Sequence, residues 1–426
     1  MSSSNPTDRK RIMLLVTPTS YRSGSFNAAA ERLNIDVIHG IDLPKTLSRE
    51  WDVPLGLDFS RPHESAAQIE QFVRDTPVDA ILSVDDSASI LAALANSRLG
   101  LPGNAPDAAL AARDKHVMRN LLAEHGVPVP VFTGFNATKD EHEMSRAVRY
   151  PCVVKPTQLS GSRGVIRADN PQEFVAAVYR TRRVIENDGE ILANATILVE
   201  DFIPGFEVAL EGLMDAGDLQ VLALFDKPDP LDGPFFEETI YVTPSRLAND
   251  VQEAIAECTK LAARALGLRE GPVHAELRVN EDGPWILEIA GRSIGGLCST
   301  ILEFGTGLAL EELILLQATG TTVRGMERRS DAVGVMMIPI PKGGVLRRVT
   351  GIAEAEAVPG ITGIEITARM NHSIVPLPEG SSYLGFIFAK GSSPDQVEEA
   401  LRQSHERLTF QISPEIRLRA VARSSR

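Results

Sequence analysis

Two carboxylates near residue 280 have a spacing that would let them bind a metal ion. They are Glu276 and Glu288 in "HAELRVNEDGPWILEIAGRSIGG", residues 274–296, and both lie among apolar residues. Turn-forming residues, 280–284, separate them, so two antiparallel strands would place the acids opposite each other, about 5 Å apart at Cβ. Two acids at that distance repel unless a cation bridges them, and Mg²⁺ accepts oxygen ligands from one or two carboxylates plus substrate phosphates. We therefore predict a magnesium site at this pair.

An arginine follows the second acid and extends the predicted site. Arg292, four residues after Glu288, supplies a planar guanidinium for a carboxylate or a phosphate. A surface cluster of arginine and glutamate is the alternative, but exposed ion pairs contribute under ~1 kcal/mol and would leave the apolar flanks unexplained. His274 shares the strand face of Glu276, and Cys298 is expected to be a small buried residue rather than a nucleophile.

A lysine followed by small residues could bind a phosphate. In "VVKPTQLSGSRGV", residues 153–165, Lys155 ends a strand, and the glycine- and serine-rich loop 160–164 follows it. Small residues let backbone N–H groups close over an anion. The spacing is not that of a Walker A loop, because the lysine precedes the glycines. A hairpin turn would give the same pattern, and Lys115, some forty residues earlier, would by itself be a solvated side chain.

A broken strand could hold a planar heterocycle. "ILVEDFIPGFEVAL", residues 197–210, breaks at a Pro-Gly pair and resumes. Its backbone near Glu200 and Ile203 would be free to form hydrogen bonds with a ring, and Glu207 would point at the group attached to that ring. A β-bulge with exposed acids is the alternative.

The elements expected to position these residues begin with alternating strands and helices. Strands are expected over 11–18, 35–42 and 78–86, and helices over 26–34, 65–76 and 87–100. This alternation predicts a parallel sheet covered by helices. Ligands bind at the carboxyl ends of such strands, where the loops 19–25 and 85–89 lie.

Longer elements follow. A helix is expected over 106–126, then a strand–loop–strand–helix–strand unit, then long strands with a helix over 250–268, and finally mostly strands from residue 330 with a closing helix. We predict a disordered tail (1–10), an α/β domain (11–105), a second domain (106–325) with a lid at about 128–200, and a C-terminal α+β domain (326–426).

The overall composition narrows the function class. With 426 residues, 43% hydrophobic and 23% charged, the chain fits a globular enzyme of several domains. A net charge of −14 argues against a nucleic-acid partner but not against a nucleotide ligand. Three widely spaced cysteines suit a reducing cytosol. Because no apolar run reaches ~18–20 residues and no signal peptide is evident, we expect no membrane contact and a cytoplasmic location.

Taken in order, these pieces resemble the ATP-grasp superfamily. The order is a helix lysine, the "VVKP" lysine, a small-residue loop, the strand "VEDFI" with "GFEV", and paired acids in "HAELR" and "LEIAGR". The resemblance spans roughly residues 11–320. It implies a multidomain α/β and α+β ATP-grasp fold, with a pre-grasp α/β domain, a small lid domain and a larger α+β domain, followed here by a C-terminal α+β cap.

The resemblance also implies cofactors, ATP with Mg²⁺ or Mn²⁺, and roles for individual residues. The ATP phosphates are assigned to Lys115, Lys155 and the lid residues Ser160, Gly161, Ser162 and Gly164; adenine to Glu200 (through its carbonyl), Phe202 and Ile203 (through its N–H); the ribose to Glu207; the γ-phosphate to Lys227; and the metal to Glu276 and Glu288. Arg292 would hold the acyl phosphate or the developing oxyanion, and with Lys155 it carries the catalytic roles.

One position separates branches of the superfamily. Many members carry Asn two residues after the second metal glutamate, where this chain has Ala290, so one or two metals remain open. An alanine there, together with "GVMMIPIPKGGVLRRVTG" in the tail, resembles the bacterial L-amino-acid (dipeptide) ligases.

The implied function is an ATP-dependent carboxylate–amine ligase that forms an amide through an acyl phosphate, releases ADP and phosphate, and uses an amino acid. Its partners are small-molecule carboxylates and amines, and the family resemblance allows a homodimer. A purine-pathway ligase, joining formate or bicarbonate to a ribonucleotide amine, and a non-catalytic ATP-binding regulatory protein are the alternatives. The pocket is expected to include the loop 19–25, with Tyr21 and Arg22, the loop 225–238, the stretch after Arg292 and the C-terminal unit.

Overall fold

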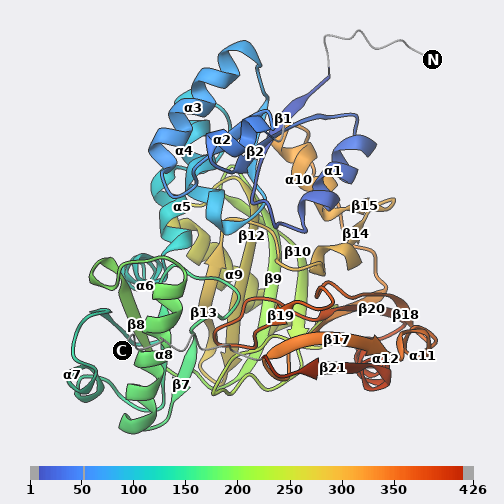
Figure 1. The fold of residues 1–426 in the computed structure, drawn as a ribbon. Helices are drawn as coiled ribbons and strands as arrows, with labels where there is room; N and C mark the ends of the chain where they lie inside the picture. Colours follow the sequence, from blue (N-terminus) through green and yellow to red (C-terminus); the bar gives the residue numbers. More distant parts are fainter. Residues whose placement is uncertain (1–8, 51–52, 416–426) are drawn as a thin grey trace, which may run out of the picture.

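The computed structural model of the protein describes residues 9–50 and 53–415. The tail predicted over 1–10 therefore lies almost wholly outside the described residues. A long central sheet lies between an N-terminal unit, at the top in blue, and a green unit at the lower left, and it continues into the C-terminal strands at the lower right (Figure 1). None of the helices in the described part of the chain combines the length and apolar character needed to span a bilayer.

The N-terminal unit is the parallel sheet that the sequence predicts. Its strand order is β3-β2-β1-β4, from β1 (Arg11–Val16), β2 (Asp36–Asp42), β3 (Leu55–Leu57) and β4 (Ala80–Ser83). The helices are α1 (Ser23–Arg32), α2 (Lys45–Glu50), α3 (Pro62–Asp75) and α4 (Ser89–Leu99). The predicted helix end at Gly100 is confirmed by its left-handed backbone, φ 66°.

The prediction of a single helix over 106–126 is wrong in one respect, because the segment forms two helices. They are α5 (Pro106–Arg113) and α6 (Lys115–Glu124). Asp114 separates them, and its side chain accepts hydrogen bonds from the N–H groups of His116 and Val117 at 2.9 and 3.2 Å. Aspartate is a favoured N-cap, so the chain starts a new helix here. Lys115 thus becomes the first residue of α6, and its side chain is buried.

The green unit is a four-stranded sheet with the order β5-β8-β6-β7. Its strands are β5 (Phe132–Asn136), β6 (Cys152–Pro156), β7 (Ile166–Ala168) and β8 (Thr196–Asp201), with α7 (Glu141–Arg146), α8 (Pro171–Asn187) and η2 (Leu192–Asn194). A core that includes the fully buried Phe174 joins α8 to the strands.

The central sheet has eight strands in the order β13-β12-β9-β10-β11-β16-β20-β18. Its first five in chain order are β9 (Phe206–Asp215), β10 (Asp218–Lys227), β11 (Ile240–Thr243), β12 (Gly271–Asn280) and β13 (Gly283–Ala290). Helix α9 (Asn249–Leu266) packs against this part through a shared apolar core.

The C-terminal strands continue that same sheet. β11 pairs antiparallel with β16 (Ala332–Ile338), which pairs with β20 (Gly385–Gly391), and β18 (Ile361–Glu365) forms the edge. The remaining elements are η1 (Asp86–Ala88), η3 (Cys298–Ile301), β14 (Glu303–Phe304), β15 (Leu308–Ala309), α10 (Leu310–Ala318), β17 (Gly344–Thr350), α11 (Ile352–Glu356), β19 (Ser373–Ile374), α12 (Pro394–Arg407) and β21 (Thr409–Ser413). The sheet therefore runs across the domain boundary that we predict at residue 326.

Candidate active site

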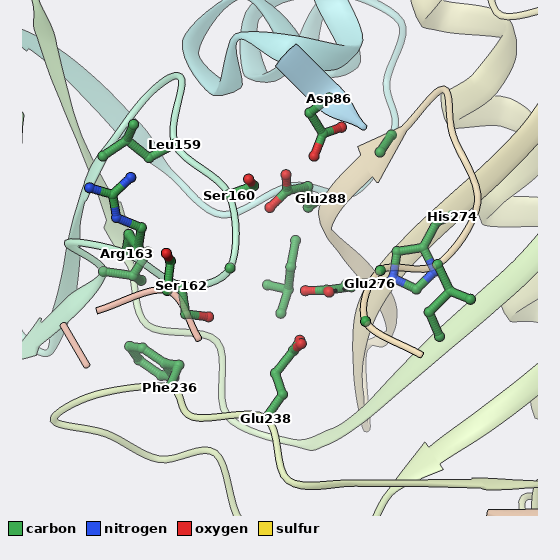
Figure 2. A pocket seen from close by; sticks show the side chains of 18 of the residues that line it. Asp86, Leu159, Ser160, Ser162, Arg163, Phe236, Glu238, His274, Glu276 and Glu288 are labelled. Atoms are coloured by element: carbon green, nitrogen blue, oxygen red, sulfur yellow. Dashed lines mark ion pairs between the residues drawn. The ribbon is translucent and has the colours of Figure 1, made fainter. Parts of the chain in front are cut away.

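One cavity of about 530 Å³ lies where these parts meet. Its walls come from the loops after β1 and β4, the loop after β6, the β12–β13 hairpin, β16 and the loop before β20. Figure 2 shows the carboxylates of Glu276, Glu288 and Asp86 turned into the cavity, with the loop that carries Ser160 and Ser162 opposite them.

The two acids that the sequence singles out face each other. In the β12–β13 ladder Glu276 is the direct partner of Glu288, and the two-residue turn ends at Gly283, whose φ of 108° suits glycine. Both side chains keep contact with the cavity, with exposed fractions of 23% and 28%. Two carboxylates open to one cavity fit a hard divalent cation such as Mg²⁺. Ala290, on the same strand as Glu288, offers no side-chain oxygen, so Glu276 and Glu288 are the metal donors that the hairpin offers at this place.

The lysines assigned to phosphates flank the loop 160–164. Lys115 Nζ lies 3.0 Å from Glu288 Oε1 and donates to the carbonyl of Leu159 at 2.8 Å. Lys155 Nζ lies 2.5 Å from Glu200 Oε2. Burial lowers the pKa of Lys155, while Glu200 acts in the opposite direction. Both ammonium groups therefore line the cavity from fixed positions.

The side chain of Glu200 is locked in a buried ion pair that sequence reasoning missed. Arg119 Nε, on α6, lies 2.6 Å from Glu200 Oε1, and the arginine is fully buried. Burial alone would raise the pKa of Glu200, but Arg119 and Lys155 lower it to about 2. The position of Arg119, four residues after Lys115 on one helix face, is the signal that could have revealed it.

The adenine candidates lie in the same cavity wall as the loop 160–164. Phe202 and Ile203 follow β8 and line the cavity. The ring of Phe202 lies 6.4 Å from that of Phe236, nearly parallel, and the Arg167 guanidinium lies 4.1 Å from its centroid. The carbonyl of Ile203 accepts from Arg278 at 3.0 Å. The assigned adenine role remains a prediction.

The small-residue loop needs its glycines. Gly161, Ser162 and Gly164 all have positive φ, at 65°, 55° and 69°. The N–H of Gly164 donates to the carbonyl of Pro378 at 2.8 Å, which ties the loop to the C-terminal part of the chain. Its role as a lid over phosphates remains a prediction.

Two residues assigned to different parts of ATP are ion-pair partners. Lys227 Nζ lies 2.8 Å from Glu207 Oε1, 2.5 Å from Glu238 Oε1 and 3.6 Å from Glu276 Oε1. Carboxylate oxygens of these three acids lie within 4.8 Å of one another, close enough to hold a metal, but the buried lysine ammonium contacts all three. Burial would lower the pKa of Lys227, and the acids raise it well above its usual value. We call this group the Lys227 cluster.

Glu238 is the member of the Lys227 cluster that the sequence does not single out. It ends the loop 225–238, which is expected to line the pocket, but no strand spacing marks its position. Burial and the nearby Glu276 raise the pKa of Glu238 to about 7, against the effect of Lys227. Figure 2 places its carboxylate below that of Glu276, pointing into the cavity.

His274 supports Glu276 from the same strand face, as the sequence predicts. Its Nδ1 lies 3.1 Å from Glu211 Oε2 and its Nε2 lies 3.6 Å from Glu276 Oε1. Burial would lower the pKa of His274, but hydrogen bonds to the two glutamates raise it to about 9.

Two arginines reach the site through the N-terminal unit. Arg292 Nε lies 2.8 Å from Asp86 Oδ1, in the loop after β4, and this acid raises the pKa of Arg292 against the effect of burial. Arg22 is buried and donates to the carbonyl of Val84 at 2.6 Å and to Ser293 Oγ. The N-terminal unit therefore orients the guanidinium that the sequence assigns to the reacting carboxyl group.

Two segments of the chain match known families. Residues 148–301 match the ATP-grasp domain, and residues 336–413 match the L-amino acid ligase C-terminal domain 2. The first match covers the loop 160–164, Glu200 and both acids of the hairpin.

Relatives and a solved structure agree with these matches. The chain is 24% identical to the uncharacterized protein y4rH of Sinorhizobium fredii, over 74% of this chain and 64% of that protein. It is 26% identical to alanine–anticapsin ligase of Bacillus subtilis, over 69% and 66%. Both matches span just under two thirds of the relative's length. The crystal structure of L-amino acid ligase from Bacillus licheniformis is similar over 95% of this chain and 99% of that chain, with 26% identity and a TM-score of 0.81. The fold class predicted from the sequence is confirmed.

Proposed function

Because the chain belongs to the ATP-grasp superfamily and carries a C-terminal domain of L-amino acid ligases, we propose that it is an ATP-dependent carbon–nitrogen ligase. It joins the carboxylate of one small molecule to the amine of another, with an amino acid among its substrates. One observation carries the proposal: a single cavity joins two lysines and a small-residue loop to an opposed pair of glutamates and an oriented arginine.

The lysine side of the cavity suits a triphosphate. Lys155 is held by Glu200, and Lys115 bridges Glu288 and the carbonyl of Leu159, so both cations are preorganised. Phosphoryl transfer depends mainly on positioning and charge neutralisation, which such groups provide.

Glu276 and Glu288 would hold Mg²⁺ or Mn²⁺. A metal bound there neutralises charge on the phosphates. With Ala290 in place of an amide, the two carboxylates are the donors that this hairpin offers. His274 holds the Glu276 side chain in its orientation.

The reaction has two steps. An oxygen of the substrate carboxylate bonds to the γ-phosphorus of ATP, and the bond to the bridging oxygen breaks, which gives an acyl phosphate and ADP. An amine nitrogen then bonds to the acyl carbon, and phosphate leaves with the electron pair as the amine loses a proton. Arg292, held by Asp86, stabilises the negative oxygen in the second step. The loop 160–164 shields the acyl phosphate from water.

A screen of amino-acid pairs with Mg-ATP tests the proposal. We expect ADP release only when a carboxylate donor and an amine acceptor are both present, and a product whose mass is that of the two joined with loss of water. ADP release with glycinamide ribonucleotide and formate, but with no amino-acid pair, would instead support the purine-pathway alternative.

Ala290 is the observation that favours a non-catalytic ATP-binding protein, because it removes a side-chain oxygen beside the metal pair. That alternative predicts thermal stabilisation by ATP without ADP release under any substrate mixture.

A further inference from the structure

The lining of this cavity includes a set of aromatic, aliphatic and sulfur side chains. We call it the tyrosine chamber; its residues are Tyr21, Tyr241, Ile294, Cys298, Met337 and Tyr383. It holds three of the five tyrosines in the chain. Its walls come from the loop after β1, from β11, from the segment 294–298 and from the C-terminal strands. Apart from the tyrosine hydroxyl groups, the side chains of the tyrosine chamber are apolar or only weakly polar.

Ring contacts join two of the walls, although Tyr21 itself is 52% exposed. The rings of Tyr21 and Tyr383 both pack on Phe386, with centroids 6.3 and 6.2 Å away. The Lys227 ammonium lies 5.1 Å from the centroid of Tyr241, which places this ring beside the Lys227 cluster. Cys298 is buried and free of any disulfide. The tyrosine chamber is therefore an apolar part of the cavity that adjoins the Lys227 cluster.

Glu238 lines the same cavity as the chamber and the acid pair. Its carboxylate shares Lys227 with Glu207 and Glu276, so one ammonium serves three acids, although Glu207 also pairs with Arg278 at 3.1 Å. The negative charge of the three carboxylates exceeds the positive charge of Lys227, so a second cation could bind next to Glu238. A substrate ammonium would supply it.

The closeness of Glu238 to Glu276 suits an α-amino acid. Glu238 and Glu276 both reach the same Lys227 Nζ within 3.6 Å, so a cation on Glu238 lies next to the acid pair. In an α-amino acid the ammonium and the carboxylate share one carbon. An ammonium at Glu238 would therefore leave the carboxylate near the acid pair and the side chain free to enter the chamber.

We propose that the tyrosine chamber binds the side chain of the carboxylate substrate, and that this substrate is an α-amino acid with a large apolar side chain, aromatic or methionine-like. The proposal rests on the ligase function proposed above. Lys227 is occupied by its acids, so its ammonium is not offered to an acidic side chain. The buried Arg22 guanidinium is held by the carbonyl of Val84 and by Ser293 Oγ. Filling an apolar pocket discriminates by about 10- to 200-fold for each methylene-sized difference.

The first experiment measures ADP release with Mg-ATP, a fixed excess of one amine acceptor, and a series of carboxylate donors. Product mass and fragmentation identify which amino acid supplied the carboxyl group. We expect kcat/KM for phenylalanine, methionine or leucine to exceed that for glycine by about 100-fold. Equal use of glycine, or a preference for aspartate or lysine, would overturn the chamber proposal while leaving the ligase function intact.

The opposite failure can also be recognised. Thermal stabilisation by phenylalanine in the presence of a non-hydrolysable ATP analogue, without ADP release from any pair, would refute the ligase function and support the chamber. Phenylpropionate, which lacks the ammonium, should bind at least about tenfold more weakly than phenylalanine. Equal binding of the two would contradict the role of Glu238.

A matched pair of variants separates specificity from stability. Met337 lines the chamber, whereas Met336, its neighbour on β16, is buried in the separate core on the other face of the sheet. In Met337→Ala we expect the kcat/KM ratio of methionine to alanine to change by about tenfold or more. Met336→Ala should lower the free energy of unfolding by about as much as Met337→Ala does, but it should leave the kcat/KM ratio unchanged. An unchanged ratio in Met337→Ala would refute the chamber.

A second variant tests the amino group. In Glu238→Gln we expect the KM of the carboxylate donor to rise about tenfold or more, with the KM of ATP unchanged. A parallel rise in both would point to general disruption of the site and would contradict the assignment.

Discussion

The two ends of the cavity carry opposite charge imbalances. At the phosphate end one buried acid, Glu200, meets two cations, Lys155 and Arg119. The other end, where we propose that the carboxylate substrate binds, is called the acyl end. There four acids meet three cations; the acids are Glu207, Glu211, Glu238 and Glu276, and the cations are Lys227, Arg278 and His274. The first end is therefore short of an anion and the second is short of a cation.

This difference indicates how the site is divided between ligands. A surplus cation suits a triphosphate, and surplus acids suit a metal ion and a substrate ammonium. The phosphate end is built mainly from a helix and a strand–loop motif, whereas the tyrosine chamber draws on segments from Tyr21 to Tyr383. Features that would bind a triphosphate can therefore be local, while those proposed to select the substrate come from distant loops.

Removing one acid of the hairpin pair should give the largest effect. In Glu288→Ala we expect ADP release to fall by about 100- to 1,000-fold, because the site loses a proposed metal donor and the partner of Lys115. Glu281→Ala, an exposed acid in the turn of the same hairpin, is the control and should keep its activity. An active Glu288→Ala enzyme would end the metal assignment.

Breaking the phosphate-end ion pair should cost stability. In Glu200→Ala, two buried cations lose their acid, and we expect the free energy of unfolding to fall by about 3–5 kcal/mol. Asp201→Ala is a matched control, because its neighbouring pair with Arg149 is largely exposed and should be worth under ~1 kcal/mol. Denaturant titration of both variants measures the difference, and equal losses would contradict it.

The same ion pair predicts a pH dependence. The folded pKa of Glu200 is lowered to about 2 from an ordinary 4.5, so its contribution is present above pH 4.5 and is lost as the pH falls towards 2. The stability difference between the wild type and Glu200→Gln should therefore shrink over that range. A difference that stays constant from pH 5 to 2.5 would show that the carboxylate charge is not what stabilises the fold.

The two ends should separate in kinetics. In Lys155→Met we expect the KM of ATP to rise by about tenfold while the KM of the amino acid changes little, the reverse of Glu238→Gln. Initial rates with each substrate varied in turn measure this. If both variants changed the same KM, the division of the cavity into two ends would be wrong.

The contact between the lid and the C-terminal part should give the smallest effect. Arg180 on α8 forms two hydrogen bonds of 2.9 Å to Glu379, close to the Gly164–Pro378 hydrogen bond. Both side chains are substantially exposed, so a double-mutant cycle should give a coupling energy under ~1 kcal/mol. A coupling energy well above ~1 kcal/mol would contradict this expectation.

Much of the hairpin pair and of the phosphate end could be predicted because their residues are fixed locally. Turn formers set the register of the hairpin, so the opposition of Glu276 and Glu288 follows from alternation along two adjacent strands. The same holds for Lys155 at the end of β6. Asp114 was the exception: its capping strength splits a helix that apolar spacing alone makes continuous, and this moves Lys115 to a helix start.

The Lys227 cluster could not be predicted, because it depends on which strands are neighbours. Lys227 and Glu207 meet because β9 and β10 pair in a register that aligns them, and Glu276 joins them because β12 pairs with β9 on its other side. Spacing along the chain carries no information about that order.

The sequence by itself determined that this protein has paired acids, a lysine-and-glycine loop and an ATP-grasp order of motifs, because periodicity and turn chemistry act over a few residues. Only the tertiary structure decided which charged side chains form ion pairs with one another and which face the cavity. Lys227 and Glu207, assigned separately to phosphate and ribose, are buried partners, while Glu238 and Tyr383 line the cavity. The physical reason is that buried charges must be paired, and their partners are set by strand order across the whole sheet.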